Sequence, residues 1–177
     1  MTKKKVLLVI APKNFRDEEL FQTQEVLRDN GIITLVTSKN EGLIRGVMGG
    51  EIQVEKSLGE IQESDYQAVI FIGGPGTSLF FTDPQIIGLA KRFYEQGKIV
   101  AAICIAPVIL ANAGLLEGKK ATVWSSPSDQ TYIKAIESKG AIFVNQPIVV
   151  DSKIITANGP TAASQFAEKI LEALKIV

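Results

Sequence analysis

The single cysteine of the chain, Cys104, is the first residue to consider for chemistry, because the 177-residue sequence contains no histidine. A chain without histidine cannot build a Ser-His-Asp or Cys-His catalytic pair of its own. Cys104 directly follows the apolar run Ile99–Ile103, which predicts a buried strand, and a short helix is expected over 106–113. A nucleophile at such a sharp strand-to-helix turn is exposed at the edge of a sheet.

This position gives Cys104 two interpretations. The positive end of the following helix favours a thiolate, which is the reactive form of cysteine. A lone cysteine is also one of the most frequently buried residue types and often acts only as a small apolar side chain. The residues alone leave both interpretations open.

Two further segments are expected at the same edge of the sheet. Gly73-Gly74-Pro75-Gly76 follows another apolar strand but has neither the dinucleotide-binding nor the P-loop spacing. It is either a plain turn or half of an oxyanion hole, shared with the N–H of Ile105. Acidic residues at 17–19 open the first predicted helix, where they complement the helix dipole, and one carboxyl group turned inward can lie beside the sulfur. If burial keeps that carboxyl protonated, it can donate a hydrogen bond to a thiolate.

Apolar strands alternate with helices along the chain, which predicts an α/β protein with a mostly parallel sheet and helices on both faces. Strands are expected at 6–10, 32–37, 68–72, 99–103 and 121–124. Helices are expected at 17–30, 84–95, 106–113, 128–138 and from Ala163 onward. Hairpins are expected at 43–54 and 148–156. Ligands of such sheets bind at the carboxyl ends of the strands.

Composition excludes several classes of protein. The 19 basic and 19 acidic side chains balance, which argues against nucleic-acid binding. One cysteine and no histidine cannot supply a usual zinc site or an internal disulfide, so we expect no metal, no cofactor and a reducing, cytoplasmic location. No stretch is long enough to span a membrane, and the apolar run at 6–11 is too short for a signal peptide. The length fits one domain over 1–177.

Taken together, these segments resemble the ThiJ/PfpI superfamily, which includes the Parkinsonism-associated protein deglycase, PfpI-type intracellular proteases and relatives of glutamine amidotransferases. The resemblance covers nearly the whole chain and is carried by 6–10 with 15–20, Ile72-Gly73-Gly74-Pro75-Gly76, Val100-Ala101-Ala102-Ile103-Cys104-Ile105-Ala106-Pro107 and Asn158-Gly159-Pro160-Thr161. It implies a flavodoxin-like three-layer sandwich that forms a homodimer or a higher homo-oligomer.

The resemblance also implies roles for single residues. Cys104 matches the nucleophile, Gly74 and Ile105 match the oxyanion-hole positions, and Glu19 matches the buried glutamate, with Glu18 as the alternative register. Protease-like members carry a histidine where Ile105 stands. Deglycase-like members carry one in the stretch matching 124–127, where Ser126 cannot act as a base near neutral pH. Asn158 stands where some members have an arginine. Ser126 and Asn158 are expected in the pocket.

Three functions follow from this pattern. The first is an enzyme acting on small reactive carbonyls, glyoxalase-like or deglycase-like, in which the Cys104 thiolate adds to an aldehyde and Glu19 moves the proton. The second is a redox-sensing or chaperone-like stress protein whose Cys104 is oxidised, and the third is a relative that binds a ligand without chemistry. A PfpI-like peptidase is disfavoured, because peptide hydrolysis needs a base to activate the nucleophile or to protonate the leaving amine.

Overall fold

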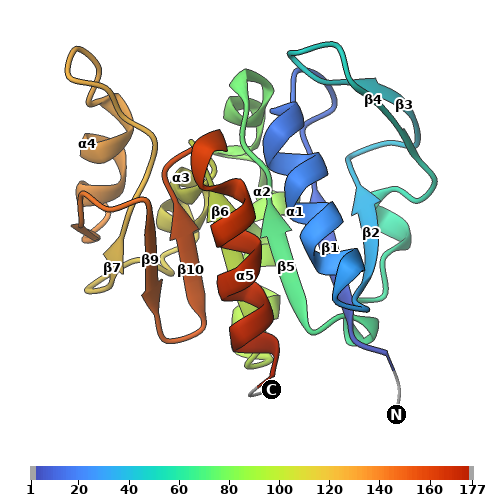
Figure 1. Ribbon diagram of the computed structural model, residues 1–177. Helices are drawn as coiled ribbons and strands as arrows, with labels where there is room; N and C mark the ends of the chain where they lie inside the picture. Colours follow the sequence, from blue (N-terminus) through green and yellow to red (C-terminus); the bar gives the residue numbers. More distant parts are fainter. Residues whose placement is uncertain (1–2, 176–177) are drawn as a thin grey trace.

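A computed structural model of the chain, which describes residues 3–175, shows a central sheet covered by helices on both faces (Figure 1). The sheet has six strands in the order β2-β1-β5-β6-β10-β9. The first five are parallel to one another, and β9 pairs antiparallel with β10 at the edge. Their bounds are β1 Lys5–Val9, β2 Ile33–Thr37, β5 Ala68–Phe71, β6 Ile99–Ile103, β9 Ile148–Asp151 and β10 Ile154–Ala157.

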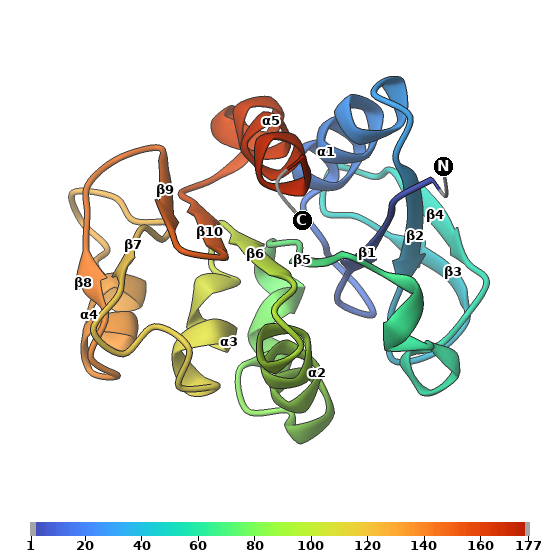
Figure 2. The ribbon, with the colours of Figure 1, turned by 90° about the horizontal axis from the view of Figure 1, so that it is seen from below.

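The helices form the two outer layers predicted from the alternation of elements. Helices α1 (Asp17–Asp29) and α5 (Ala163–Leu174) cover one face, and α2 (Pro84–Glu95) and α3 (Pro107–Asn112) cover the other (Figure 2). Alternate strand residues serve the two layers: Leu7 and Val9 join the apolar cluster under α2 and α3, whereas Val6 and Leu8 join the cluster under α1 and α5. A strand buried on both faces is therefore apolar throughout, which is why these runs predicted the sheet.

Two small two-stranded sheets flank this sandwich. Strands β3 (Gly42–Arg45) and β4 (Glu51–Val54) form the predicted antiparallel hairpin, and β7 (Lys120–Ala121) pairs parallel with β8 (Ile142–Phe143). The second predicted hairpin is also present, with Ser152 at its turn in the left-handed conformation (φ +57°). No helix of residues 3–175 is long and apolar enough to cross a membrane.

The predicted strand over 121–124 is wrong beyond Ala121. The next backbone N–H groups do not continue a strand ladder: that of Thr122 donates to the Thr156 hydroxyl (2.9 Å), and that of Trp124 donates to the carbonyl of Cys104 (2.9 Å). This stretch is therefore tied to the ends of β10 and β6, and it brings Trp124 to the carboxyl edge of the sheet.

The helix predicted over 128–138 is shorter than expected, since α4 runs only from Thr131 to Glu137. Ser126 and Asp129 exchange backbone hydrogen bonds (2.9 and 3.1 Å) and close a tight turn instead of a first helical turn. The Asp129 carboxylate then accepts from the N–H of Thr131 (2.9 Å), which satisfies a free donor at the start of α4.

Helix α2 begins at Pro84, as the sequence predicted, and Asp83 precedes it as the N-cap residue. The Asp83 carboxylate accepts from the N–H groups of Gln85 (2.9 Å) and Ile86 (3.2 Å) and pairs with Lys39 (2.8 Å). We expect Asp83→Ala to lower the free energy of unfolding by about 1 kcal/mol, because two helix N–H groups lose their acceptor. Urea denaturation measures the loss. Asp83→Asn, which keeps the cap oxygen, should recover most of it, and equal stability of the wild type and Asp83→Ala would contradict this role.

Candidate active site

Cys104 occupies the turn between β6 and α3 with its backbone in the left-handed region, at φ +64°. This conformation costs a residue with a side chain roughly 1–2 kcal/mol. It is held by hydrogen bonds on both sides, because the Cys104 N–H donates to Ala157 (2.9 Å) and its carbonyl accepts from Trp124 (2.9 Å). The residue is only 8% exposed. The elbow therefore holds the Cys104 side chain at the carboxyl end of β6, on a backbone that is strained.

Glu19 reaches the same point from α1 and is completely buried. Its Oε2 accepts a hydrogen bond from the N–H of Gly73 (2.9 Å). A Cβ added to Gly73 would lie 2.4 Å from the Cβ of Cys104 and 2.6 Å from Glu19 Oε2. Glycine at 73 is thus what lets the carboxyl group and the cysteine approach each other. Glu18, the alternative register, turns instead to Arg16 (3.0 Å) and is one third exposed.

Burial controls the charge of Glu19. Desolvation raises the pKa of its carboxyl group from 4.5 to about 7, against the opposing effects of the Gly73 N–H, the Cys104 thiol and the Arg16 charge. Near neutral pH this carboxyl can therefore exist in either protonation state. A general acid or base works best when its pKa lies close to the working pH.

The Cys104 thiol responds to the same surroundings. Burial raises the pKa of the thiol, and the negative charge of Glu19 raises it further, whereas the N–H groups of Gly74 and Ile105 lower it. The expected partly exposed thiolate is thus not the resting form, because both burial and an ionised Glu19 favour the neutral thiol. Protonation of Glu19 removes the repulsion and adds a donor, so that one proton is shared by the pair.

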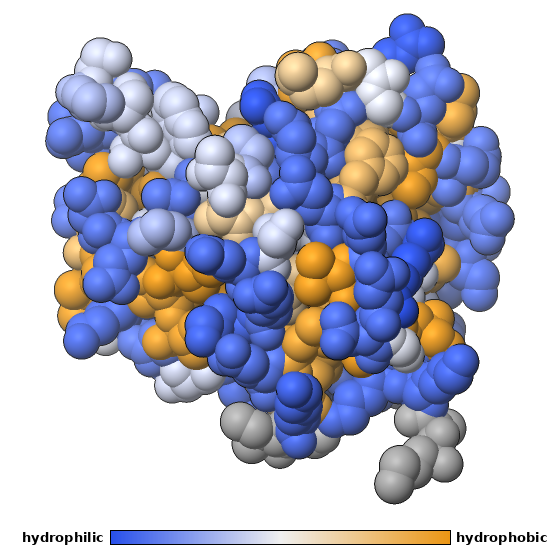
Figure 3. Space-filling model, in the orientation of Figure 1, coloured by the Kyte–Doolittle hydropathy of each residue, from blue (hydrophilic) through white to orange (hydrophobic). Residues whose placement is uncertain are grey.

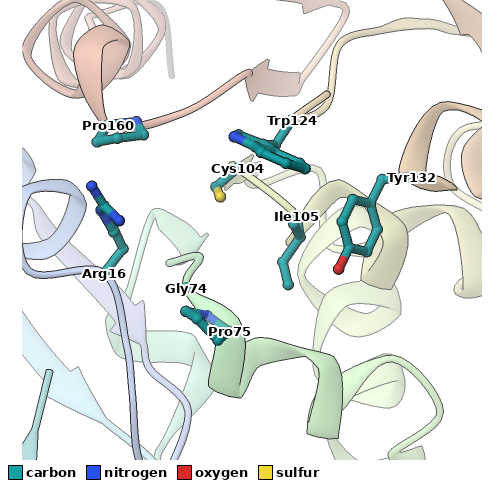
Figure 4. A pocket seen from close by; sticks show the side chains of 8 residues that line it. All are labelled: Arg16, Gly74, Pro75, Cys104, Ile105, Trp124, Tyr132 and Pro160. Atoms are coloured by element: carbon teal, nitrogen blue, oxygen red, sulfur yellow. The ribbon is translucent and has the colours of Figure 1, made fainter. Parts of the chain in front are cut away.

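Cys104 lies on the wall of a cavity of about 300 Å³ at the carboxyl edge of the sheet (Figure 4). Trp124 and Tyr132 form one side of it, packed edge to face with ring centroids 6.0 Å apart. Phe81 supports Tyr132 from behind in the same geometry (6.1 Å). Arg16 faces this aromatic wall from the opposite side, with Cys104 between them. The other lining residues are Gly74, Pro75, Ile105 and Pro160.

The structure brings four of the six predicted site residues together. Cys104, Gly74 and Ile105 line the cavity, and Glu19 lies behind Gly73. Ser126 and Asn158 are not among the lining residues. The Ser126 hydroxyl accepts from the N–H of Asp129 (3.1 Å), and the backbone of Asn158 donates to Pro147 (3.0 Å).

Several lining residues were not predicted from the sequence. Arg16 directly precedes the acidic residues 17–19, and only those acidic residues were expected at this edge of the sheet. Tyr132 belongs to α4, whose position depends on tertiary contacts, and Trp124 lies in the stretch 121–124 that the pattern assigns to a strand. In residues 3–175 no three Cys, Asp or Glu side chains gather closely enough to hold a metal ion.

The chain belongs to the DJ-1/PfpI family, whose model matches residues 4–173. It is 42% identical to the uncharacterized protein MJ0967 of Methanocaldococcus jannaschii over 99% of this chain and 84% of that one. It is 27% identical to deglycase TK1284 of Thermococcus kodakarensis, over 87% of this chain and 90% of the relative. It is 26% identical to the glutathione-independent glyoxalase DJR-1.2 of Caenorhabditis elegans, over 97% of this chain and 89% of the relative.

Solved structures show the same fold. The ThiJ/PfpI domain protein of Brachyspira murdochii superposes with a TM-score of 0.92 at 32% identity, over 99% of both chains. The predicted flavodoxin-like sandwich and the predicted family are therefore confirmed.

The close approach at Gly73 gives a first test of the site. We expect Gly73→Ala to push Cys104 and Glu19 apart and to increase the reactivity of the thiol toward a maleimide or iodoacetamide, because the carboxylate that raises the pKa of the thiol moves away, with a loss of stability of about 1–3 kcal/mol from overpacking. Gly59→Ala is the matched control, because a Cβ there meets nothing nearer than 4.0 Å. Unchanged thiol kinetics in Gly73→Ala would show that the contact does not shape the site.

The raised pKa of Glu19 predicts a pH dependence of stability. The folded chain keeps a proton on Glu19 up to about pH 7, whereas the unfolded carboxyl group loses it near 4.5. Stability from the protonated group is fully present below the unfolded pKa and is lost as the pH rises to the folded one, by up to about 1.4 kcal/mol per pH unit.

Urea denaturation between about pH 5 and about pH 8 measures this loss. We expect wild type to lose stability relative to Glu19→Gln, which cannot ionise, while Glu18→Gln follows the wild type. Parallel pH profiles of wild type and Glu19→Gln would contradict the shift.

Proposed function

We propose that the chain is a cysteine-dependent enzyme that acts on small reactive carbonyl compounds in the manner of a glyoxalase or deglycase. The convergence of Cys104 and Glu19 at Gly73 carries this proposal, because it couples a nucleophile to an acid or base whose pKa is about 7. Relatives in the same family are named as deglycases and as a glutathione-independent glyoxalase, which supports the assignment.

In the proposed reaction, ionised Glu19 takes the thiol proton as the Cys104 sulfur attacks the aldehyde carbon of an α-oxoaldehyde. The carbon–oxygen π electrons move to the oxygen, which the N–H groups of Gly74 and Ile105 stabilise. Glu19 then returns the proton to this oxygen and leaves a hemithioacetal. The reaction thus starts from the neutral Cys104 thiol, the form that burial favours, and from the ionised fraction of Glu19, which is substantial near and above its pKa of about 7.

The second half of the reaction needs a proton moved between adjacent carbons. Glu19 removes the proton from the carbon bound to sulfur, and the resulting enediol is protonated on the neighbouring carbon. This oxidises the former aldehyde carbon to a thioester and reduces the ketone to an alcohol. Water then cleaves the thioester to a 2-hydroxy acid and frees Cys104, so that the net change is the addition of one water molecule.

The missing histidine assigns all of this proton transfer to Glu19. In the stretch where deglycase-like members carry histidine, Trp124 faces the cavity and Ser126 does not line it. General acid–base assistance contributes typically about 10²–10⁴-fold. We therefore propose slower turnover than in members that have histidine. The same absence weighs against peptide hydrolysis, which must protonate an amine leaving group.

The redox-sensing alternative also finds support at the elbow. The N–H groups of Gly74 and Ile105 beside the sulfur can stabilise the oxygens of an oxidised cysteine, and the chain has no second cysteine to form a disulfide. The 8% exposure of Cys104 and its raised pKa weigh against rapid oxidation. Intact mass after mild peroxide separates the two functions, since the sensor must gain oxygen at Cys104 faster than an ordinary thiol.

Substitutions at the pair test the enzymatic proposal. We expect Cys104→Ser and Glu19→Gln each to reduce methylglyoxal turnover at least about 100-fold, because each removes a group that the reaction requires. Formation of D- or L-lactate measures turnover, and thermal unfolding checks that the variants fold. Glu18→Gln is the matched control for the position of the carboxyl group and should retain most of the activity. Turnover that survives Cys104→Ser would refute the proposal.

A further inference from the structure

We infer that the substrate is an α-oxoaldehyde bearing an anionic group, such as a carboxylate, at the end of a short carbon chain, and that Arg16 binds this anion. The inference rests on the proposed function as far as the aldehyde of the substrate is concerned. The anionic group is inferred only from the residues that line the cavity.

The position of Arg16 is the first observation. Of the eight residues that line the cavity, Arg16 alone carries a permanent charge. Its guanidinium group lies across the cavity from Trp124, with the Cys104 sulfur between them (Figure 4). A small molecule whose aldehyde meets the sulfur can therefore extend from Cys104 away from the aromatic wall and bring its far end to Arg16.

The way in which Arg16 is held is the second observation. Its backbone N–H donates to Gly73 (2.9 Å), the same residue that joins Cys104 and Glu19. Its side chain is one third exposed and donates from Nη2 to Glu18 (3.2 Å). A guanidinium has five N–H groups, of which Glu18 contacts at most two, so that donors remain for a ligand. The backbone and the side chain of Arg16 are thus both held by hydrogen bonds to residues next to the site.

The size and polarity of the cavity agree with such a ligand. About 300 Å³ lies at the small end of ligand pockets, which suits a metabolite of a few carbons. The apolar rings of Pro75 and Pro160 suit the methylene carbons, and the N–H groups of Gly74 and Ile105 suit the reacting oxygen. A planar guanidinium matches a carboxylate in charge and shape.

A pair of matched substrates tests the inference. The probes are 4,5-dioxopentanoate, an α-oxoaldehyde with a terminal carboxylate, and 2-oxopentanal, which has the same carbon chain without it. We expect kcat/KM to be at least about tenfold higher for the carboxylate, as a charge-assisted contact provides. Arg16→Gln should bring the ratio of the two kcat/KM values to about one, and because both substrates use the same Glu19, this ratio does not depend on what the lost charge does to that carboxyl group; Arg16→Lys should keep part of the preference.

Glu18→Gln sharpens the test. This substitution removes the carboxylate that competes for the guanidinium, and it should raise the preference for 4,5-dioxopentanoate above that of the wild type. A merely structural role of Arg16 would change the turnover of both substrates alike. A wild-type ratio near one, or a ratio that Arg16→Gln leaves unchanged, overturns the inference.

Binding separates a failure of this inference from a failure of the proposed function. Trp124 is the only tryptophan of the chain and lines the cavity, so its fluorescence reports occupancy. We expect 4-oxopentanoate, which lacks the aldehyde, to bind the wild type about tenfold more tightly than 2-pentanone and to lose this advantage in Arg16→Gln. If no α-oxoaldehyde is turned over but this preference is present, the chemistry fails and the anion site stands. Equal affinity of the two ketones refutes the anion site.

Discussion

The site depends on the close approach of two buried groups at Gly73. The N–H of this glycine holds Glu19, its missing side chain makes room for the Cβ of Cys104, and its carbonyl accepts from the backbone of Arg16. One residue without a side chain thus joins the end of its own strand to two segments that are far apart in sequence, 16–19 and the elbow at Cys104. The burial that results is also what raises the pKa of Glu19 into the neutral range. Packing and acid–base chemistry therefore have the same origin in this molecule.

The fold supports this point of contact from both sides of the sheet. Helix α1 delivers Glu19 from one face and α3 begins just after Cys104, while β1, β5 and β6 bring their carboxyl ends to one edge (Figure 1). Seen from outside, the surface above this edge is hollowed between two raised parts of the molecule (Figure 3). Because these parallel strands are buried on both faces, the positions of the groups after them are fixed by the core and not by the loops alone.

The amino-acid sequence predicted those parts of the molecule that depend on local pattern. Continuous apolar runs identified β1, β5 and β6, and the single cysteine after β6 identified the elbow. The prediction failed where residues distant in sequence determine the local structure. The N–H of Thr122 donates to the Thr156 hydroxyl and that of Trp124 to the Cys104 carbonyl, and no local pattern reveals these partners. The cavity walls were missed for the same reason, since Tyr132 and Arg16 reach the site only through the packing of α4 and α1. The proton sharing of the pair follows from burial, which only the folded structure shows.

The left-handed backbone of Cys104 has a consequence for how this chain can change. Among the amino acids, glycine is the one that adopts this conformation freely. Stability by itself therefore favours glycine at this position. Under the proposed function, selection for folding and selection for activity oppose each other at the elbow. A relative that has lost its activity would be free to relax this strain, so the residue found at the elbow marks whether the chemistry is still in use.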